Sequence, residues 1–171
     1  MTAAVSADSK AMTAKSPESQ LSAFMARYTP EIVALARGAL KKMRTRLPGA
    51  IQLVYDNYNA LVIGFGPTDR ASDAIFSIVL YPRWVTLFFL NGVNLPDPTK
   101  ILKGSGKRVR HIVLDDAATL DKAEVRALMA RALKQEGDSL KHGRAGRIVI
   151  KSISAKQRPR RPAAGKHRES E

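Results

Sequence analysis

The first periodic segment of the chain begins at Pro30. Apolar residues recur there every three or four positions, which is the spacing of one face of an α-helix. They are Ile32, Leu35, Ala36, Ala39, Leu40, Met43 and Leu47. Thr29 offers a capping oxygen, and Pro48-Gly49 ends the pattern, because proline cannot continue the helical hydrogen bonds. The pattern predicts an amphipathic helix over residues 30–47, after a short helical segment that begins near Leu21.

Beyond residue 50 the pattern changes to the alternation and short apolar runs that are typical of β-strands. The runs cover residues 51–55, 60–65, 74–81, 84–90 and 108–114, with a weaker run at 147–154. Two of them, "AIFSIVLY" and "WVTLFFL", are apolar at nearly every position, which favours central strands. The weak last run predicts an edge strand.

A second amphipathic helix is predicted between Asp121 and Gly137. Asp121 and Glu124 have the spacing of a capping box, and Gly137 is a typical helix stop. Hairpins that lie between terminal helices favour an α+β fold, in which the helices pack on one face of an antiparallel sheet.

Composition divides the 171-residue chain into one domain and two ends. Residues 1–20 are rich in Ala, Ser and Thr without periodicity and predict a disordered leader, whereas residues 155–171 are rich in Pro and Arg and predict a disordered basic tail. Residues 21–154 are expected to form the α+β domain. No apolar run reaches the roughly 18 residues of a membrane span. There is also no apolar secretory signal, so we expect a cytoplasmic protein without membrane contact.

Charge and cysteine content narrow the chemistry further. The absence of cysteine excludes disulfides, thiolate metal sites and cysteine nucleophiles. The formal net charge is +14, and residues 141–171 carry ten bases against two acids. A flexible basic tail would bind phosphate backbones in a salt-sensitive manner without regard to sequence. Non-specific nucleic-acid binding by the tail is therefore one hypothesis, and a solubilising tail is the alternative.

Several segments stand in an order that resembles a known family. They are "YTPEIVALA", "PGAIQLVYDNYNAL", "SIVLYPRWVTLFF" and "LPDPTKILKGSGKRVRHI", followed by the second helix. Together, from about Phe24 to Leu133, they resemble the YdhG-like family, domain of unknown function 1801. The resemblance implies a frataxin-like arrangement of helices against an antiparallel sheet and, for some members, an iron-chaperone role. Residues 30–46 depart from an iron carrier, because they hold one acid, Glu31, against five bases.

The segment "ILKGSGKRVRHIV" is the main candidate for an anion site. Its spacing matches neither a Walker loop nor a dinucleotide-binding fingerprint. Glycines on either side of Ser105 nevertheless allow backbone N–H groups to converge on an oxyanion. The candidate anion-binding residues are Lys103, Gly104, Ser105, Gly106, Lys107, Arg108 and Arg110. The alternative is a hairpin turn in which glycine supplies positive φ and the bases are solvated.

A second cluster groups hydrogen-bonding and aromatic side chains in a turn. The candidate pocket residues are Tyr55, Asp56, Asn57, Tyr58, Asn59 and Trp84. This mixture suits a small ligand, whereas the alternative is an Asx-type turn with rings packed on the sheet. Core packing is the alternative to a stacking role for Trp84 and Phe89.

Metal and catalytic sites are weakly indicated. Asp115 and Asp116 are candidate oxygen ligands for a hard cation, but the spacing matches no calcium loop. His111 lies in a predicted strand, where a structural role is favoured over general-base chemistry. No paired carboxylates, hydrolase elbow or activated nucleophile stands out. We therefore expect a non-enzymatic binding domain, without a cofactor, for a small anion or an acidic protein surface.

Overall fold

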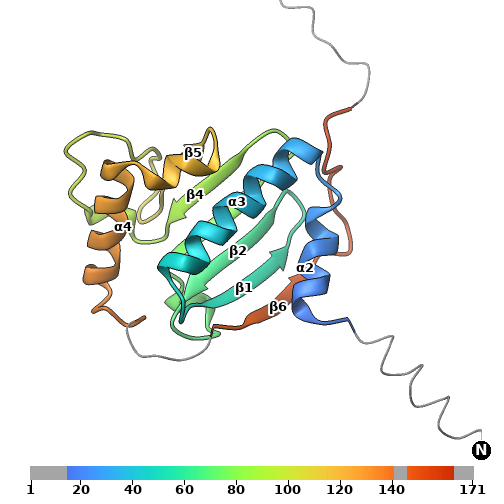
Figure 1. Cartoon of the computed structure of the whole chain (residues 1–171), viewed down its shortest axis with the longest axis horizontal. Coiled ribbons are helices and arrows are strands. Elements are labelled where there is room, and N and C mark those ends of the chain that lie inside the picture. The colour runs from blue at the N-terminus through green and yellow to red at the C-terminus, as the bar shows by residue number, and fades with distance from the viewer. Residues whose placement is uncertain (1–14, 141–145, 164–171) are drawn as a thin grey trace, which may run out of the picture.

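The computed structural model describes residues 15–140 and 146–163 of the chain. Figure 1 shows a curved sheet with the helices on one of its faces. The sheet contains β1 (Ile51–Asp56), β2 (Leu61–Gly66), β3 (Phe76–Leu80), β4 (Val85–Phe89), β5 (Arg110–Leu114) and β6 (Ile148–Ile153). The helices in the described ranges are α2 (Pro17–Met25), α3 (Pro30–Arg46) and α4 (Ala123–Gln135), with 3-10 turns η1 (Ala71–Asp73), η2 (Gly92–Asn94) and η3 (Ala117–Asp121). The predicted α+β class is confirmed.

The sheet follows chain order except at one edge. Its order is β5-β4-β3-β2-β1-β6, and from β1 to β5 each strand pairs antiparallel with the next strand along the chain. The chain returns from α4 to the far edge, where β6 pairs with β1 in parallel. The expectation of a purely antiparallel sheet is therefore wrong for this strand, because β6 enters the sheet by a crossover and not by a hairpin.

The core lies between the helices and one face of the sheet. The stripe predicted in α3 is buried except for Leu35, which is partly buried, and Ala36, Ala39 and Met43 are fully enclosed. Alternate residues of the strands, such as Ile63, Ile78 and Leu87, meet it from the sheet. Side chains at the intervening positions point to the other face, since successive strand residues alternate. No helix in the described ranges covers that face (Figure 1). Nor, within those ranges, is any helix both long and apolar enough to span a membrane.

The folded region begins earlier than expected. Helix α2 starts at Pro17, and the hydroxyl of Ser16 caps it by accepting a bond from the Ser19 N–H. Ser16-Pro17-Glu18 is itself a helix-start signal, with a capping hydroxyl before a proline and an acid in the first turn. This signal lies at the end of an Ala/Ser-rich segment whose composition predicts disorder. Residues 1–14 of the predicted leader lie outside the described residues.

The predicted capping box of α4 is wrong, although its end at Gly137 is confirmed. The N-cap position is Lys122, and no side chain caps it. The Asp121 carboxylate instead contacts Lys42 at 2.6 Å and Arg46 at 2.5 Å, both on α3. At the other end Gly137 takes φ +70°, the left-handed conformation that ends many helices. The local pattern assigned Asp121 to capping, but its carboxylate forms ion pairs with α3 instead.

The chain after residue 154 is also placed differently from the prediction. Residues 155–163 lie against the domain, and Arg160 is 3 % exposed. The disordered tail is therefore a wrong prediction for these nine residues, since a buried side chain and several hydrogen bonds fix them. Residues 164–171 of the predicted tail lie outside the described residues.

Candidate ligand-binding groove

The helix-free face of the sheet carries an open groove of about 1250 Å³. Its floor consists of outward-facing side chains of the central strands: Val62 from β2, Ser77 and Val79 from β3, and Phe88 from β4. The floor is therefore mainly apolar, as small-molecule sites commonly are.

Aromatic side chains from two turns form walls of the groove. Tyr58, in the β1–β2 turn, is 49 % exposed, and Trp84, in the β3–β4 turn, is 46 % exposed. The Tyr81 and Trp84 rings lie 5.4 Å apart between centroids, and burial raises the pKa of the Tyr81 hydroxyl. Half-exposed rings beside an apolar floor offer stacking surface to a planar group.

The C-terminal segment, residues 154–163, forms another wall. The Ser154 N–H donates to the Asp56 carbonyl at 2.9 Å, and the Arg158 N–H donates to the Tyr58 carbonyl at 2.9 Å. The segment therefore runs beside the end of β1 and the β1–β2 turn. Arg158, Pro159 and Pro162 line the groove from this side.

A buried ion pair holds this segment in place. Arg160 Nη2 lies 2.9 Å from Asp56 Oδ1, and each side chain is 1 % exposed. The same guanidinium donates to the carbonyls of Asn57 and Tyr58 and lies 5.8 Å from the centroid of the Tyr28 ring. The second Asp56 oxygen accepts from Arg27 Nη1 at 3.3 Å. These bonds compensate most of the buried charge, although Arg160 Nε is buried without a hydrogen-bond partner in the described part of the chain.

The charged residues of the groove lining, within the described chain, are all arginines. They are Arg83, Arg158 and Arg161, with no Asp or Glu among the lining residues. Arg158 lies over the Tyr58 ring at 5.6 Å from its centroid, and Arg161 Nε donates to the Arg27 carbonyl at 3.1 Å. Three cations without a lining carboxylate give the groove a positive potential.

The pocket predicted from the β1–β2 turn is brought together only in part. Asn57, Tyr58, Asn59 and Trp84 all line the groove. Asp56 lies beneath them in the buried ion pair. Tyr55 is not a lining residue, and its buried hydroxyl has no hydrogen-bond partner in the described part of the chain. Burial raises the pKa of that hydroxyl.

The glycine-containing loop is a turn in which two arginine side chains donate hydrogen bonds to acceptors of the protein itself. Gly104 takes φ +118°, and Lys103 exchanges two 2.9 Å backbone hydrogen bonds with His111. Arg110 Nη1 donates to the carbonyls of Gly106 and Val109 at 2.6 and 2.8 Å. Arg108 donates twice to the amide oxygen of Asn91. Two of the predicted anion-binding cations are thus bonded to protein acceptors, while Ser105 and Lys107 are exposed. Anion binding by this loop stays a prediction.

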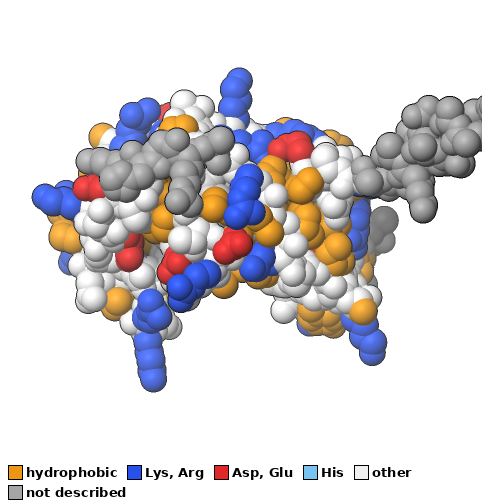
Figure 2. All heavy atoms as spheres, turned by 90° about the horizontal axis from the view of Figure 1, so that it is seen from below, with side chains coloured by type: hydrophobic (Ala, Val, Ile, Leu, Met, Phe, Trp, Pro, Cys, Tyr) orange, Lys and Arg blue, Asp and Glu red, His pale blue; other side chains and the backbone are white. Residues whose placement is uncertain are grey.

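Basic side chains are dispersed over one face of the molecule (Figure 2). Figure 2 shows one face on which Lys and Arg side chains are widely spaced and several lie beside Asp or Glu side chains. Asp121 has several cationic neighbours, because besides Lys42 and Arg46 it lies 3.7 Å from Arg126. The hydrogen bond from Lys42 lowers the pKa of the Asp121 carboxyl, and the nearby positive charges lower it further.

The weak metal candidates lie apart from any larger ligand cluster. Asp115 is exposed, and Asp116 caps η3 by accepting from the Thr119 N–H at 3.0 Å. Within the described ranges, no three His, Asp or Glu side chains gather closely enough to share a metal ion. His111 lies with its ring 5.5 Å from the Phe88 ring, so packing accounts for its position.

Comparisons with known proteins identify no relative of this chain. No protein-family model, no curated protein and no solved structure matches the chain.

Proposed function

We propose that this chain is a non-enzymatic binding domain and that the groove on its helix-free sheet face takes an anionic ligand with an aromatic or apolar body. One observation carries the proposal: an apolar floor and two half-exposed rings lie beside three arginines, with no lining carboxylate in the described chain. The anion preference deduced from the basic loop is kept, but its location moves to the groove.

The chemistry of the lining fits such a ligand in two ways. The floor and the rings of Tyr58 and Trp84 gain free energy by covering apolar surface, at roughly 25 cal/mol per Å². Arginine is suited to carboxylate, sulfonate and phosphate groups, because its planar fork donates two parallel hydrogen bonds. A neutral ligand would use only the first contribution, whereas a cation would oppose the second.

Two rival functions remain predictions. Iron carriage is implied by the YdhG-like resemblance, yet α3 presents one acid, Glu31, among five bases. Nucleic-acid binding by the tail would use Arg158, Arg160 and Arg161, and the hydrogen bonds and ring contacts of these residues hold them against the domain. Neither rival has a specific geometric observation in its favour.

Trp84 makes the proposal directly testable, because it is the single tryptophan of the chain. Titration with 1-anilinonaphthalene-8-sulfonate should quench Trp84 emission with saturation. N-phenyl-1-naphthylamine has the same rings without the sulfonate and should bind about tenfold more weakly, which corresponds to about 1.4 kcal/mol. The difference in affinity should shrink at high salt, since dissolved ions screen the attraction between exposed charges.

Matched variants locate the charge that is responsible. Arg83→Gln and Arg158→Gln should each weaken binding of the sulfonate probe and leave the affinity for the neutral probe unchanged. Arg70→Gln is the control, because Arg70 pairs with Asp73 and does not line the groove. Equal affinity for the two probes, or an equal loss in the control, would exclude the proposal.

A further inference from the structure

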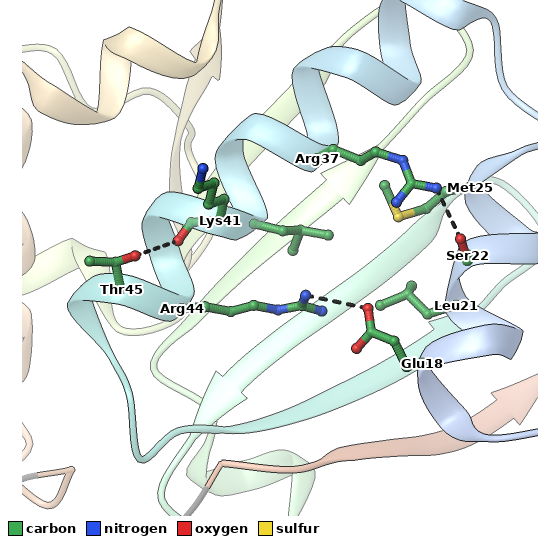
Figure 3. Close-up of a pocket in the computed structure, with 9 residues that line it drawn as sticks. Glu18, Leu21, Ser22, Met25, Arg37, Lys41, Arg44 and Thr45 are labelled. Carbon is green, nitrogen blue, oxygen red and sulfur yellow. Dashed lines mark hydrogen bonds and ion pairs between the residues drawn. The ribbon is translucent and has the colours of Figure 1, made fainter.

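A second cavity lies between α2 and α3, on the helical side of the sheet. Its volume is about 360 Å³. Leu21 and Met25 from α2 and Leu40 from α3 are buried beneath it. Polar side chains surround this apolar base: Glu18, Ser22, Arg37, Lys41, Arg44 and Thr45. Figure 3 shows the Arg37 and Arg44 side chains extending from α3 toward α2.

The cavity has an excess of positive charge. Arg37, Lys41 and Arg44 stand four and three residues apart on α3, so they share one edge of the helix. Glu18 is the one acid in the described lining. It pairs with Arg44, and within the described ranges no ion pair joins a carboxylate to Arg37 or Lys41.

The Arg44 guanidinium is fixed by one hydrogen bond and has another donor atom that can bond to a further acceptor. Its Nε donates to Gln52 Oε1 at 2.9 Å, and Gln52 is a buried residue of β1. Its Nη2 atom is buried and lacks a hydrogen-bond partner within the described chain. A buried donor without an acceptor is costly, so a ligand oxygen that reaches it is favoured.

The existing contacts at the mouth of the cavity are easily replaced. Glu18 Oε1 lies 3.4 Å from Arg44 Nη1, which is longer than a strong charge-assisted bond, and the Glu18 side chain is 63 % exposed. Arg37 Nη2 donates to the Ser22 hydroxyl at 2.9 Å, a neutral acceptor (Figure 3). An anion with two charges would attract both guanidinium groups more strongly than these partners do.

We propose that this cavity is a separate site for a phosphate group, carried by a small phosphomonoester. Arg37 and Arg44 bind the phosphate oxygens, and Ser22 donates its hydroxyl proton to one of them. The ester body lies over Leu21, Met25 and Leu40, since the volume of about 360 Å³ exceeds that of a bare phosphate and lies just above the roughly 300 Å³ lower limit of small-molecule pockets. Glu18 competes with the ligand for Arg44.

The competition gives the test an unusual sign. Calorimetric titration of the full chain with glycerol 3-phosphate should show saturable binding, and inorganic phosphate should bind more weakly. Arg37→Gln should weaken glycerol 3-phosphate binding at least tenfold. Glu18→Gln should strengthen it severalfold, because the variant removes the competing carboxylate and its repulsion of the phosphate. Arg131→Gln is the control, since Arg131 lies on α4 and outside the cavity lining.

Other outcomes would overturn the site. Absence of saturable binding to glycerol 3-phosphate excludes it. So does binding that Glu18→Gln weakens or leaves unchanged, or that Arg37→Gln and Arg131→Gln weaken equally. Trp84 fluorescence reports on the groove and should not respond to glycerol 3-phosphate. This readout separates failure of the helical cavity from failure of the proposed groove function.

Discussion

Arg160 shows how one side chain fixes a segment that composition alone makes look disordered. On folding, its guanidinium exchanges hydrogen bonds with water for bonds to Asp56 and two carbonyl groups, and it lies against the Tyr28 ring. Sequence patterns identify buried apolar residues, but they carry no signal for a buried arginine whose partner lies about a hundred residues earlier. The grouping of the β1–β2 turn with Trp84 was predictable, because polar and aromatic residues of turns commonly line pockets, and the structure brings Asn57, Tyr58, Asn59 and Trp84 into one groove. The arginines that complete the groove were not.

Removing one partner of the buried pair should be costly. Arg160→Met leaves Asp56 buried with only the half-exposed Arg27, and we expect a loss of about 3 kcal/mol in the free energy of unfolding, measured by urea denaturation. Arg161→Met is the control and should cost under about 1 kcal/mol, because Arg161 is exposed. Similar losses in both variants would contradict a specific role for the pair.

Tyr28 gives a pH-dependent prediction. Its hydroxyl donates to the Leu80 carbonyl and accepts from the Leu61 N–H, so Tyr28→Phe should cost about 1–3 kcal/mol. Burial raises the pKa of Tyr28 above its ordinary value of 10.0. Folding therefore favours the neutral phenol, and this contribution is complete below pH 10 and is lost as the pH rises toward the folded-state pKa.

Urea midpoints measured from pH 8 to 11 check this. Tyr55 and Tyr81 have pKa values raised by burial as well, so Tyr28→Phe should reduce the alkaline loss of stability without abolishing it. An unchanged alkaline slope would show that Tyr28 does not contribute.

At the scale of elements, the strands and helices were largely predictable because one-sided burial imposes a period on the sequence. Helix α3 follows that period closely, whereas β3 and β4 were predictable as continuous apolar runs, since nearly every residue of these strands is buried. The parallel pairing of β6 was not predictable, because an edge strand of six residues fits either direction. The cap of α4 failed for a related reason: Asp121 serves ion pairs to α3, which depend on tertiary structure and not on local spacing.

The contact between α3 and η3 depends on a residue without a side chain. A Cβ atom at Gly38 would lie 2.8 Å from the Cβ of Ala117. Gly38→Ala should therefore destabilise the fold by about 1–2 kcal/mol in urea denaturation, because overpacking outweighs the roughly 1 kcal/mol gain in helix propensity. Gly106→Ala should be nearly neutral, since its nearest neighbour would lie 3.9 Å away. A stabilised Gly38→Ala variant would show that η3 yields without cost.

At the scale of the whole molecule, the groove depends on a segment that is distant in sequence from its other walls. The described C-terminal residues form one side of the groove. They also supply Arg158 and Arg161, so this segment contributes both to the shape and to the positive charge of the groove. A chain that ends at Ala163 retains every described contact, whereas one that ends at Ile153 removes the wall and the Arg160 anchor.

These two truncations form a matched pair. The chain ending at Ala163 should keep the melting temperature and the Trp84 response of the full chain. The chain ending at Ile153 lacks Arg160, so it should melt about 6–12 °C lower, as a loss of about 3 kcal/mol implies for a domain of this size, and it should lose the Trp84 response. If the shorter chain binds the sulfonate probe normally, the C-terminal segment is not part of the site.

The most direct test of the central claim is to map the probe on the protein by NMR. In ¹⁵N-labelled full-length protein, 1-anilinonaphthalene-8-sulfonate should shift the indole N–H of Trp84 and the backbone amides of Tyr58, Phe88 and Arg158. The amides from Gly104 to Arg110 should not move. Shifts confined to that basic loop, with the Trp84 indole unmoved, would contradict the groove as the ligand site.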